Sequence, residues 1–171
     1  MKEKMTILRN LFVILLTGVL ITSCQKDKPD PADNLIGTWT AESATVDATV
    51  GGKTMSEYFT GLGYSAADAQ LLTNLFNVTV QQNFTGTITF KSDKTYTSTL
   101  GSGSDSGTWS LSNDSKQLTI DSTTDPAIIL NIDKLTVDQL KVNWTENGQQ
   151  DLNNDNVAES ITANVNMIFT K

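Results

Sequence analysis

Few side chains in this sequence are able to do nucleophilic or redox chemistry. The 171 residues contain no histidine, and Cys24 is the one cysteine. Ser–His and Cys–His nucleophile pairs need an imidazole base, and many catalytic metal sites need imidazole ligands, so neither can be built from these residues. The run "GSGSDSG" at 101–107 lacks the lysine and the strand-to-helix context of a phosphate-binding loop. Carboxylates are the reactive groups that remain.

The acids mostly stand at turns, as Asp93, Asp114 and Asp133 do. Turns favour Asp because its side chain accepts hydrogen bonds from the nearby backbone, so these positions need no chemical role. A hydrolase that uses paired carboxylates stays open as one hypothesis. Two acids facing each other in a pocket would support it, but the alternation described below does not predict such a pair. We therefore expect a protein that is not an enzyme.

The segment 151–159, "DLNNDNVAE", has the spacing of a calcium-binding loop. Oxygen-bearing side chains stand at its first, third, fifth and ninth positions, namely Asp151, Asn153, Asp155 and Glu159. Calcium takes six to eight oxygen ligands, usually with a bidentate Glu at the twelfth position, where this chain has Thr162. Asn156 stands at the usual glycine and can adopt the left-handed conformation. The alternative, which we favour, is an Asn/Asp-rich hairpin turn without metal. If calcium binds to this segment, we expect the binding to be weak and structural, and we expect no other cofactor.

From Leu35 onward, apolar residues alternate with polar ones. This period of two predicts strands, and short turns between them predict an antiparallel meander. Eight such strands can close into an all-β, up-and-down barrel wide enough for one small ligand. The predicted strands are 36–42, 78–90, 96–100, 109–111, 118–120, 128–132, 140–144 and 161–169.

Two short helices are predicted between the first and second strands, over 54–63 and 65–76. Ser65 is a suitable N-cap, and Asp68 stands in the first turn of the second helix. Leu71, Leu72, Leu75 and Phe76 form an apolar face at helical spacing. We expect the pair to cover the barrel as a lid, with Tyr58, Phe59, Leu71 and Leu75 facing inward, or simply to cap the core.

The N-terminal residues read as a secretory signal peptide over 1–23, with Lys2, Lys4 and Arg9 before an apolar stretch from Leu11 to Ile21. That stretch is too short to cross a bilayer. The sequence "LITSC" that ends at Cys24 resembles a bacterial lipobox, which implies that Cys24 carries acyl chains such as palmitate and anchors the chain in a membrane. The alternative is an ordinary signal peptide with a chance cysteine.

Gln25-Lys26-Asp27 resembles the surface-export tag of Bacteroidetes lipoproteins, which implies the cell outer membrane and surface exposure. Residues 24–34 are polar and contain proline, so we expect a flexible tether. Without residues 1–23 the chain has 9 basic and 18 acidic side chains, a net charge of −9. This acidity argues against nucleic-acid binding, because phosphates need Lys and Arg partners.

"LIGTW" at 35–39 resembles the Gly-x-Trp opening of lipocalins and fatty-acid-binding proteins. "GTITFKSDKTYTS", "GTWSLSNDSKQLTI" and "ILNIDKLTVDQLKVNW" resemble lipocalin-like domains of Bacteroidetes lipoproteins, and the resemblance extends over about 35–171. In that family the first-strand Trp plugs one end of the barrel beneath a basic side chain. Residues 24–171 contain no arginine, so Lys141 or Lys171 would take that place.

The barrel interior is the candidate ligand site, with Tyr96 or Gln82 orienting a polar head. The inward candidates are Trp39, Phe84, Ile88, Phe90, Tyr96, Trp109, Leu130, Val142 and Trp144. The alternative is a barrel filled by these same side chains. In addition, Asp121-Ser122-Thr123 resembles the O-glycosylation sequence of Bacteroidetes exported proteins, with Ser122 as the acceptor.

We therefore expect a monomeric, lipid-anchored surface protein whose barrel domain, residues 35–171, binds a small hydrophobic or amphipathic molecule. The alternative is a structural or accessory surface lipoprotein whose filled barrel acts through contacts with a protein partner. Whether the barrel is hollow distinguishes the two hypotheses.

Overall fold

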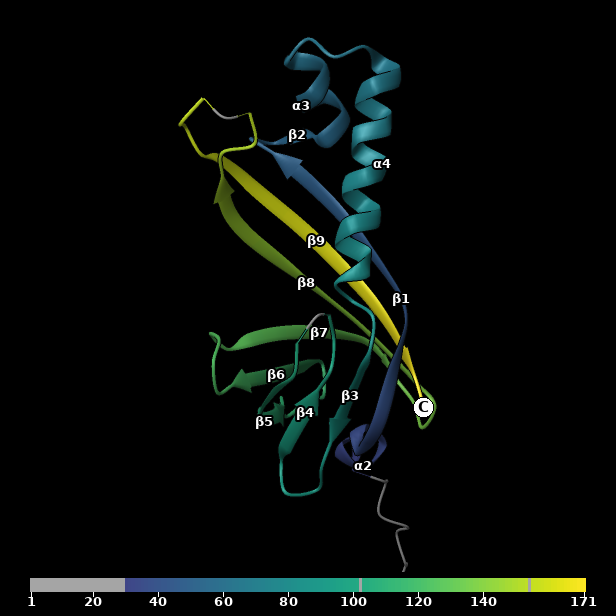
Figure 1. Ribbon diagram of the computed structural model, residues 1–171. Helices are drawn as coiled ribbons and strands as arrows, with labels where there is room; N and C mark the ends of the chain where they lie inside the picture. The colour runs from purple at the N-terminus through teal and green to yellow at the C-terminus, as the bar shows by residue number, and fades with distance from the viewer. Residues whose placement is uncertain (1–29, 102, 154) are drawn as a thin grey trace, which may run out of the picture.

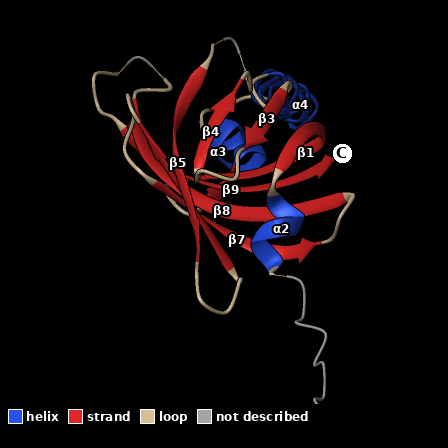
Figure 2. Ribbon diagram, turned by 90° about the horizontal axis from the view of Figure 1, so that it is seen from below, coloured by secondary structure: helices blue, strands red, loops and turns tan. Residues whose placement is uncertain are grey.

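The fold is one antiparallel sheet that closes on itself (Figures 1 and 2). The computed structural model describes residues 30–101, 103–153 and 155–171. Each strand from β3 to β9 pairs with its neighbour along the chain, and β1 pairs with both β3 and β9. The predicted eight-stranded, up-and-down barrel is confirmed, with a two-residue strand, β2, added beside the end of β1.

The strands differ strongly in length. Their bounds are β1 Gly37–Val50, β2 Lys53–Thr54, β3 Thr87–Phe90, β4 Thr95–Ser98, β5 Asp105–Leu111, β6 Gln117–Ser122, β7 Ile128–Leu135, β8 Gln139–Gln150 and β9 Glu159–Thr170. Three of them, β1, β8 and β9, have 12 to 14 residues, whereas β3 and β4 have four each. The long strands therefore continue beyond the barrel as a three-stranded ribbon, here called the arm (45–50, 145–150 and 159–164), which is clear in Figure 1.

The interior of the barrel is built by the predicted alternation. On β8 the buried residues are Leu140, Val142 and Trp144, and on β9 they are Val165, Met167 and Phe169. Directly opposite residues of antiparallel strands point to the same face of the sheet, so these six side chains share the inner face. Each large apolar side chain that is fully buried contributes about 1.5–3 kcal/mol, and this layer holds the barrel together.

One end of the barrel is closed by Trp39, which is fully buried. Its Nε1–H donates to the carbonyl of Leu35 at 2.7 Å, in the helix α2, Pro31–Leu35. The Nζ of Lys171 lies 4.5 Å from the centroid of the Trp39 ring and donates to the carbonyls of Asn34 and Ile36 at 2.6 and 2.7 Å. Of the two lysines considered as the cover of this tryptophan, Lys171 therefore takes the place.

The Gly-x-Trp opening has a steric reason at this end. Gly37 has φ +130, and a Cβ there would lie 3.0 Å from Cε of Lys171. A side chain at Gly37 would strain the backbone and displace the lysine that covers Trp39. Because α2 already contains Pro31–Leu35, the folded part of the chain begins a few residues before Leu35, inside the segment interpreted as a tether. Residues 1–29, including the predicted signal peptide and Cys24, lie outside the described residues.

The other end of the barrel faces two helices, α3 (Met55–Gly61) and α4 (Ala66–Gln82). Thr54 and Glu57 form a capping box at the start of α3, and Ser65 caps α4 as predicted. In Figure 1, α3 sits at the far end of the arm and α4 runs from there back to the barrel. Among the described residues, no helix is long and apolar enough to span a membrane.

The predicted strand 78–90 is wrong over its first half. Residues 78–82 are the last turns of α4, and β3 begins only at Thr87. Val and Thr favour strands, but a helix that is already capped and packed continues through them at little cost. Asn83 ends the helix, and Gly86, with φ +124, lets the chain turn where a Cβ would lie 2.2 Å from the carbonyl oxygen of Thr99.

Candidate functional site

The barrel encloses an apolar cavity of about 250 Å³. Seven of the nine predicted interior residues line it, namely Phe84, Ile88, Phe90, Tyr96, Leu130, Val142 and Trp144. Further apolar walls come from Leu100, Leu118, Ile120, Ile128, Leu140, Met167 and Phe169. The inner face of the sheet therefore provides both the core and the walls of a space that the side chains do not fill.

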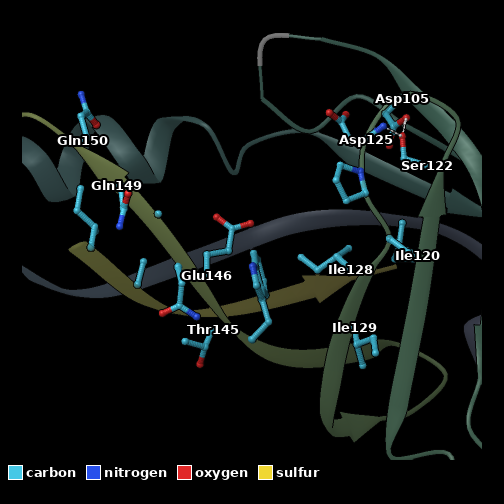
Figure 3. Close-up of a pocket in the computed structure, with 17 residues that line it drawn as sticks. Asp105, Ile120, Ser122, Asp125, Ile128, Ile129, Thr145, Glu146, Gln149 and Gln150 are labelled. Atoms are coloured by element: carbon cyan, nitrogen blue, oxygen red, sulfur yellow. Dashed lines mark hydrogen bonds between the residues drawn. The ribbon is translucent and has the colours of Figure 1, made fainter. Parts of the chain in front are cut away.

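A second, open cavity of about 1030 Å³ adjoins the first on the side of the arm and is here called the vestibule. Its walls are the arm residues of β8 and β9 on one side and the β6–β7 connection, 122–127, with the start of β7 on the other. Figure 3 shows Asp105, Ser122 and Asp125 together on the β6–β7 side, while Glu146 rises from β8. The difference in strand length creates this space, because β8 and β9 continue where β6 and β7 have ended.

Four residues line both cavities and therefore lie where the two adjoin, a place here called the mouth: Asp105, Ile120, Ile128 and Trp144. Two are aliphatic, one is an indole and one is a carboxylate. A molecule that occupies the barrel through the vestibule has to pass these side chains, and an amphipathic molecule would leave its polar end beside them.

Asp105 is held by three donors. The hydroxyl of Tyr96 donates to Oδ2, and the Ser122 hydroxyl and the Ser106 N–H donate to Oδ1 at 2.8 and 2.7 Å. Burial alone raises the pKa of a carboxyl, but these hydrogen bonds outweigh it, so the pKa of Asp105 is below its usual value. Burial and the hydrogen bond to Asp105 raise the pKa of Tyr96. The mouth therefore holds a fixed negative charge at neutral pH.

Trp144 is the other polar group of the mouth. Its side chain is 8% exposed and packs edge-on against Phe84, with the ring centroids 5.7 Å apart. Within the described part of the chain, its Nε1 is the one buried side-chain nitrogen or oxygen that has no hydrogen-bond partner. Leaving a buried N–H without an acceptor costs about 1–3 kcal/mol of free energy. A ligand that supplies the acceptor would recover this free energy when it binds.

Trp39 and Trp109 line neither cavity, which corrects their assignment to the ligand site. Trp109 is 2% exposed, its Nε1–H donates to the carbonyl of Lys91 at 3.2 Å, and Lys94 Nζ lies 4.0 Å from its ring centroid. Both tryptophans belong to the closed end. Gln82 is exposed on α4 and does not reach the cavity either, so Tyr96 alone of the two candidates lies there.

The four predicted lid residues do not reach either cavity. Leu71 and Leu75 are 58% and 56% exposed, whereas Leu72 and Phe76 on the same helix are half-buried. The apolar face that the sequence predicted for α4 is therefore split, since only part of it packs against β1. Tyr58 and Phe59 are half-buried on α3, at the far end of the arm. The helices thus cover the arm rather than the cavity.

The segment 151–159 connects β8 and β9, and its carboxylates accept hydrogen bonds from within the protein. Asp151 accepts from the N–H groups of Asp155 and Asn156, and Asp155 accepts from the Val157 N–H at 2.8 Å and the Asn153 side chain at 3.0 Å. Asn156 has φ +68, the left-handed conformation considered for it. These bonds are what the hairpin-turn alternative requires, and calcium binding stays a prediction.

Glu159, the fourth residue of the suggested calcium set, is also engaged. Oε1 accepts from the hydroxyl of Tyr58 at 2.6 Å, and Oε2 accepts from the Leu152 N–H at 2.9 Å. These bonds lower the pKa of Glu159, and the bond to Glu159 raises the pKa of Tyr58 to about 12. The described residues contain no group of three or more Asp, Glu or Cys side chains placed to hold a metal ion.

Ser122 ends β6 at the edge of the vestibule, and its hydroxyl donates to Asp105. Glycosylation there stays a prediction. Sequence reasoning missed Asp105 because it lies in the Gly/Ser-rich segment 101–107, between the predicted strands 96–100 and 109–111. The alternation of Asp105, Gly107 and Trp109 along β5 places all three on one face of the strand, and this signal could have identified the carboxylate as inward-facing.

The family model that matches the sequence agrees with this architecture. The sequence matches the family described as "Lipocalin-like domain (DUF4923)" over residues 17–148. No curated protein matches the chain. A solved structure that is similar to this chain is a DUF4847 family protein from Bacteroides vulgatus ATCC 8482, with 14% sequence identity and a TM-score of 0.39. The alignment covers 80% of this chain and 92% of that chain.

Proposed function

The chain belongs to the family of lipocalin-like domains, and on this premise we propose that it is a lipid-anchored surface lipoprotein whose barrel binds a small apolar or amphipathic molecule. The observation that carries the proposal is the apolar cavity of about 250 Å³ that opens through the mouth into the vestibule. Ligand pockets have this character, with apolar walls and a few convergent polar groups at one end.

The composition of the walls supports binding of an apolar body. Most lining residues are aliphatic or aromatic, and the polar groups belong to Asn83, Tyr96, Ser98, Asp105 and the indole N–H of Trp144. An alkyl chain that leaves water for such walls gains about 0.8 kcal/mol for each buried CH₂ group. The polar end of the molecule would stay at the mouth, where it contacts Asp105 and Trp144 or the water of the vestibule.

The membrane anchor is proposed from the sequence around Cys24, which lies outside the described residues. Two or more acyl chains on that cysteine would hold the protein on a bilayer, since a single chain gives only reversible binding. The outer membrane and the cell surface are proposed from the resemblance of Gln25-Lys26-Asp27 to a surface-export tag. A binding role rather than catalysis is supported by the absence of histidine from the sequence and by the engagement of Asp105 with three donors.

Native mass spectrometry of residues 25–171, purified without detergent, tests the binding proposal. This segment includes every described element of the barrel. We expect an additional mass that is removed by organic extraction. Two neighbouring residues of β4 provide matched variants: Ser98→Met fills the cavity, whereas Thr97→Met adds the same side chain to the exposed face.

We expect Ser98→Met to lose the additional mass and Thr97→Met to keep it. A clean apo mass for the parent protein, unchanged after incubation with apolar and amphipathic molecules of several shapes, would contradict the proposal. It would favour the accessory role, in which the protein acts through contacts with a protein partner. Globomycin-sensitive processing and labelling with radioactive palmitate in a bacterial host test the anchor separately, with Cys24→Ala as the unlabelled control.

A further inference from the structure

The charges around the two cavities all have one sign. The vestibule is lined by three carboxylates, Asp105, Asp125 and Glu146, and neither cavity is lined by a lysine. An amphipathic anion such as a fatty acid, seated with its chain in the barrel, would bring its carboxylate next to these groups with no cation to pair with. Like charges at short range destabilise one another, and the effect grows where water is excluded.

Asp105 is the carboxylate of this group that also lines the inner cavity. Its two oxygens already accept from the hydroxyls of Tyr96 and Ser122 and from the Ser106 N–H. These donors fix the side chain in place and stabilise the charged form, so the carboxylate cannot turn away from an incoming head group. Tyr96 is itself fully buried, which makes this arrangement part of the barrel wall rather than a surface contact.

Trp144 is an independent indication of what the mouth accepts. Its Nε1 is buried and has no partner, although the indole borders both cavities. An N–H cannot accept a hydrogen bond, so the group that completes this site must carry a lone pair, as a hydroxyl, ether or carbonyl oxygen does.

We propose that Asp105 and Trp144 form a polar subsite at the mouth that takes the uncharged or cationic head of an amphiphile and rejects amphiphilic anions. Trp144 donates to an oxygen of the head group, and Asp105 pairs with an ammonium group or accepts from a hydroxyl. Asp125 and Glu146 extend the negative field over the entrance. This inference rests on the proposed function, because it assumes that the barrel is the binding site.

Three probes with the same chain and different heads test the subsite: decylamine, decanol and decanoate. Residues 25–171 would be titrated with each at neutral pH, by calorimetry and native mass spectrometry. We expect decylamine and decanol to bind more tightly than decanoate by about tenfold or more, as one unfavourable charge pair requires.

Asp105→Asn should weaken decylamine binding and strengthen decanoate binding, each by about tenfold. Asp121→Asn is the matched control, because Asp121 lies on the neighbouring strand β6, next to Ile120, but is exposed and lines neither cavity. Glu146→Gln removes a vestibule charge whose side chain has no hydrogen-bond partner among the described residues, so it tests the charge without disturbing the barrel wall. It should shift both affinities in the same directions as Asp105→Asn, by a smaller factor.

Trp144→Phe tests the indole N–H donor separately from the charge of Asp105. It should weaken decanol binding several-fold and leave decylamine binding unchanged, since an ammonium group accepts no hydrogen bond. Decanoate binding as tight as decylamine binding, or equal effects of Asp105→Asn and Asp121→Asn, would overturn the subsite and leave the proposed function standing. Failure of all three probes to bind would overturn the proposed function together with the subsite.

Discussion

At the closed end of the barrel, Trp39 and Trp109 each have a carbonyl that accepts from the indole N–H and a lysine Nζ within 4.5 Å of the ring centroid. At the open end, Trp144 has no acceptor for its N–H, and the charged side chains that line the vestibule are carboxylates. All three tryptophans are buried, at 0%, 2% and 8% exposure. Burial therefore does not distinguish a structural tryptophan from a candidate binding residue, whereas an unsatisfied N–H and the sign of the nearby charge do.

The largest expected difference between the two ends is in stability. Trp39→Ala should lower the free energy of unfolding by about 3–5 kcal/mol, because it leaves a cavity in packed surroundings and removes the bond to Leu35. Trp144→Ala should cost about 1–2 kcal/mol less, since this side chain already borders a cavity and its unpaired N–H is removed with it. Urea unfolding of both variants measures the difference, and equal losses would contradict the distinction between the ends.

The lysine over Trp39 provides a smaller effect. Lys171→Met removes two hydrogen bonds to backbone carbonyls and the contact with the indole face, and it should lower the free energy of unfolding by about 1–2 kcal/mol. Lys141→Met is the control, because no side-chain partner of Lys141 occurs among the described residues, and it should change stability by less than about 0.5 kcal/mol. Thermal unfolding at equal salt concentration compares the two, and a larger loss for Lys141→Met would disprove the role of Lys171.

The carboxylate of the mouth should make the open end sensitive to acid. The folded pKa of Asp105 is below its unfolded value of about 3.9, so its hydrogen bonds stabilise the folded state fully above that pH. This contribution is lost as the pH falls through the lower, folded pKa. Urea unfolding between neutral pH and about pH 3 should show a shallower acid loss for Asp105→Asn than for the parent protein. Asp121→Asn should follow the parent, and parallel curves for all three would contradict the prediction.

The smallest expected effect is spectroscopic. A ligand oxygen that accepts from Trp144 should shift the tryptophan emission to longer wavelength, while Trp39 and Trp109, whose N–H groups already have partners, contribute no change. Titration with decanol measures the shift. Trp109→Phe should retain it and Trp144→Phe should abolish it. A shift that survives Trp144→Phe would show that the ligand lies elsewhere.

The sequence predicted the closed end far better than the open end. The alternation of apolar residues acts locally and pairwise along the strands, and it predicted the barrel. The resemblance of the Gly-x-Trp opening to lipocalins implied the plug at Trp39 and a basic cover, for which Lys141 and Lys171 were the candidates. All nine predicted interior residues except Phe84 and Leu130 are buried, and seven of the nine line the inner cavity, because the period of two determines which face of a strand is buried.

The open end depends on features that alternation does not report. The end of α4 at Gln82 was taken for strand, because Val78, Thr79 and Val80 have strand propensity and the competing helix depends on packing. To predict the mouth, one has to know that β8 and β9 extend beyond the ends of β6 and β7. This depends on how the strands pair and not on the sequence of any one strand. That Trp144, unlike Trp39, lacks an acceptor follows only from the three-dimensional arrangement.

The position of α2 has a consequence for orientation. The described chain begins at Asp30 and enters α2 directly beside Trp39, so residues 1–29 join the described chain at the closed end. If Cys24 holds the protein to a bilayer, the plugged end is turned toward the lipid, and the arm and the entrance to the barrel are turned away from it, since Figure 1 shows α2 and the arm at opposite ends. Cargo would then arrive from the surrounding medium or from an opposing surface, rather than by lateral extraction from the leaflet beneath the protein.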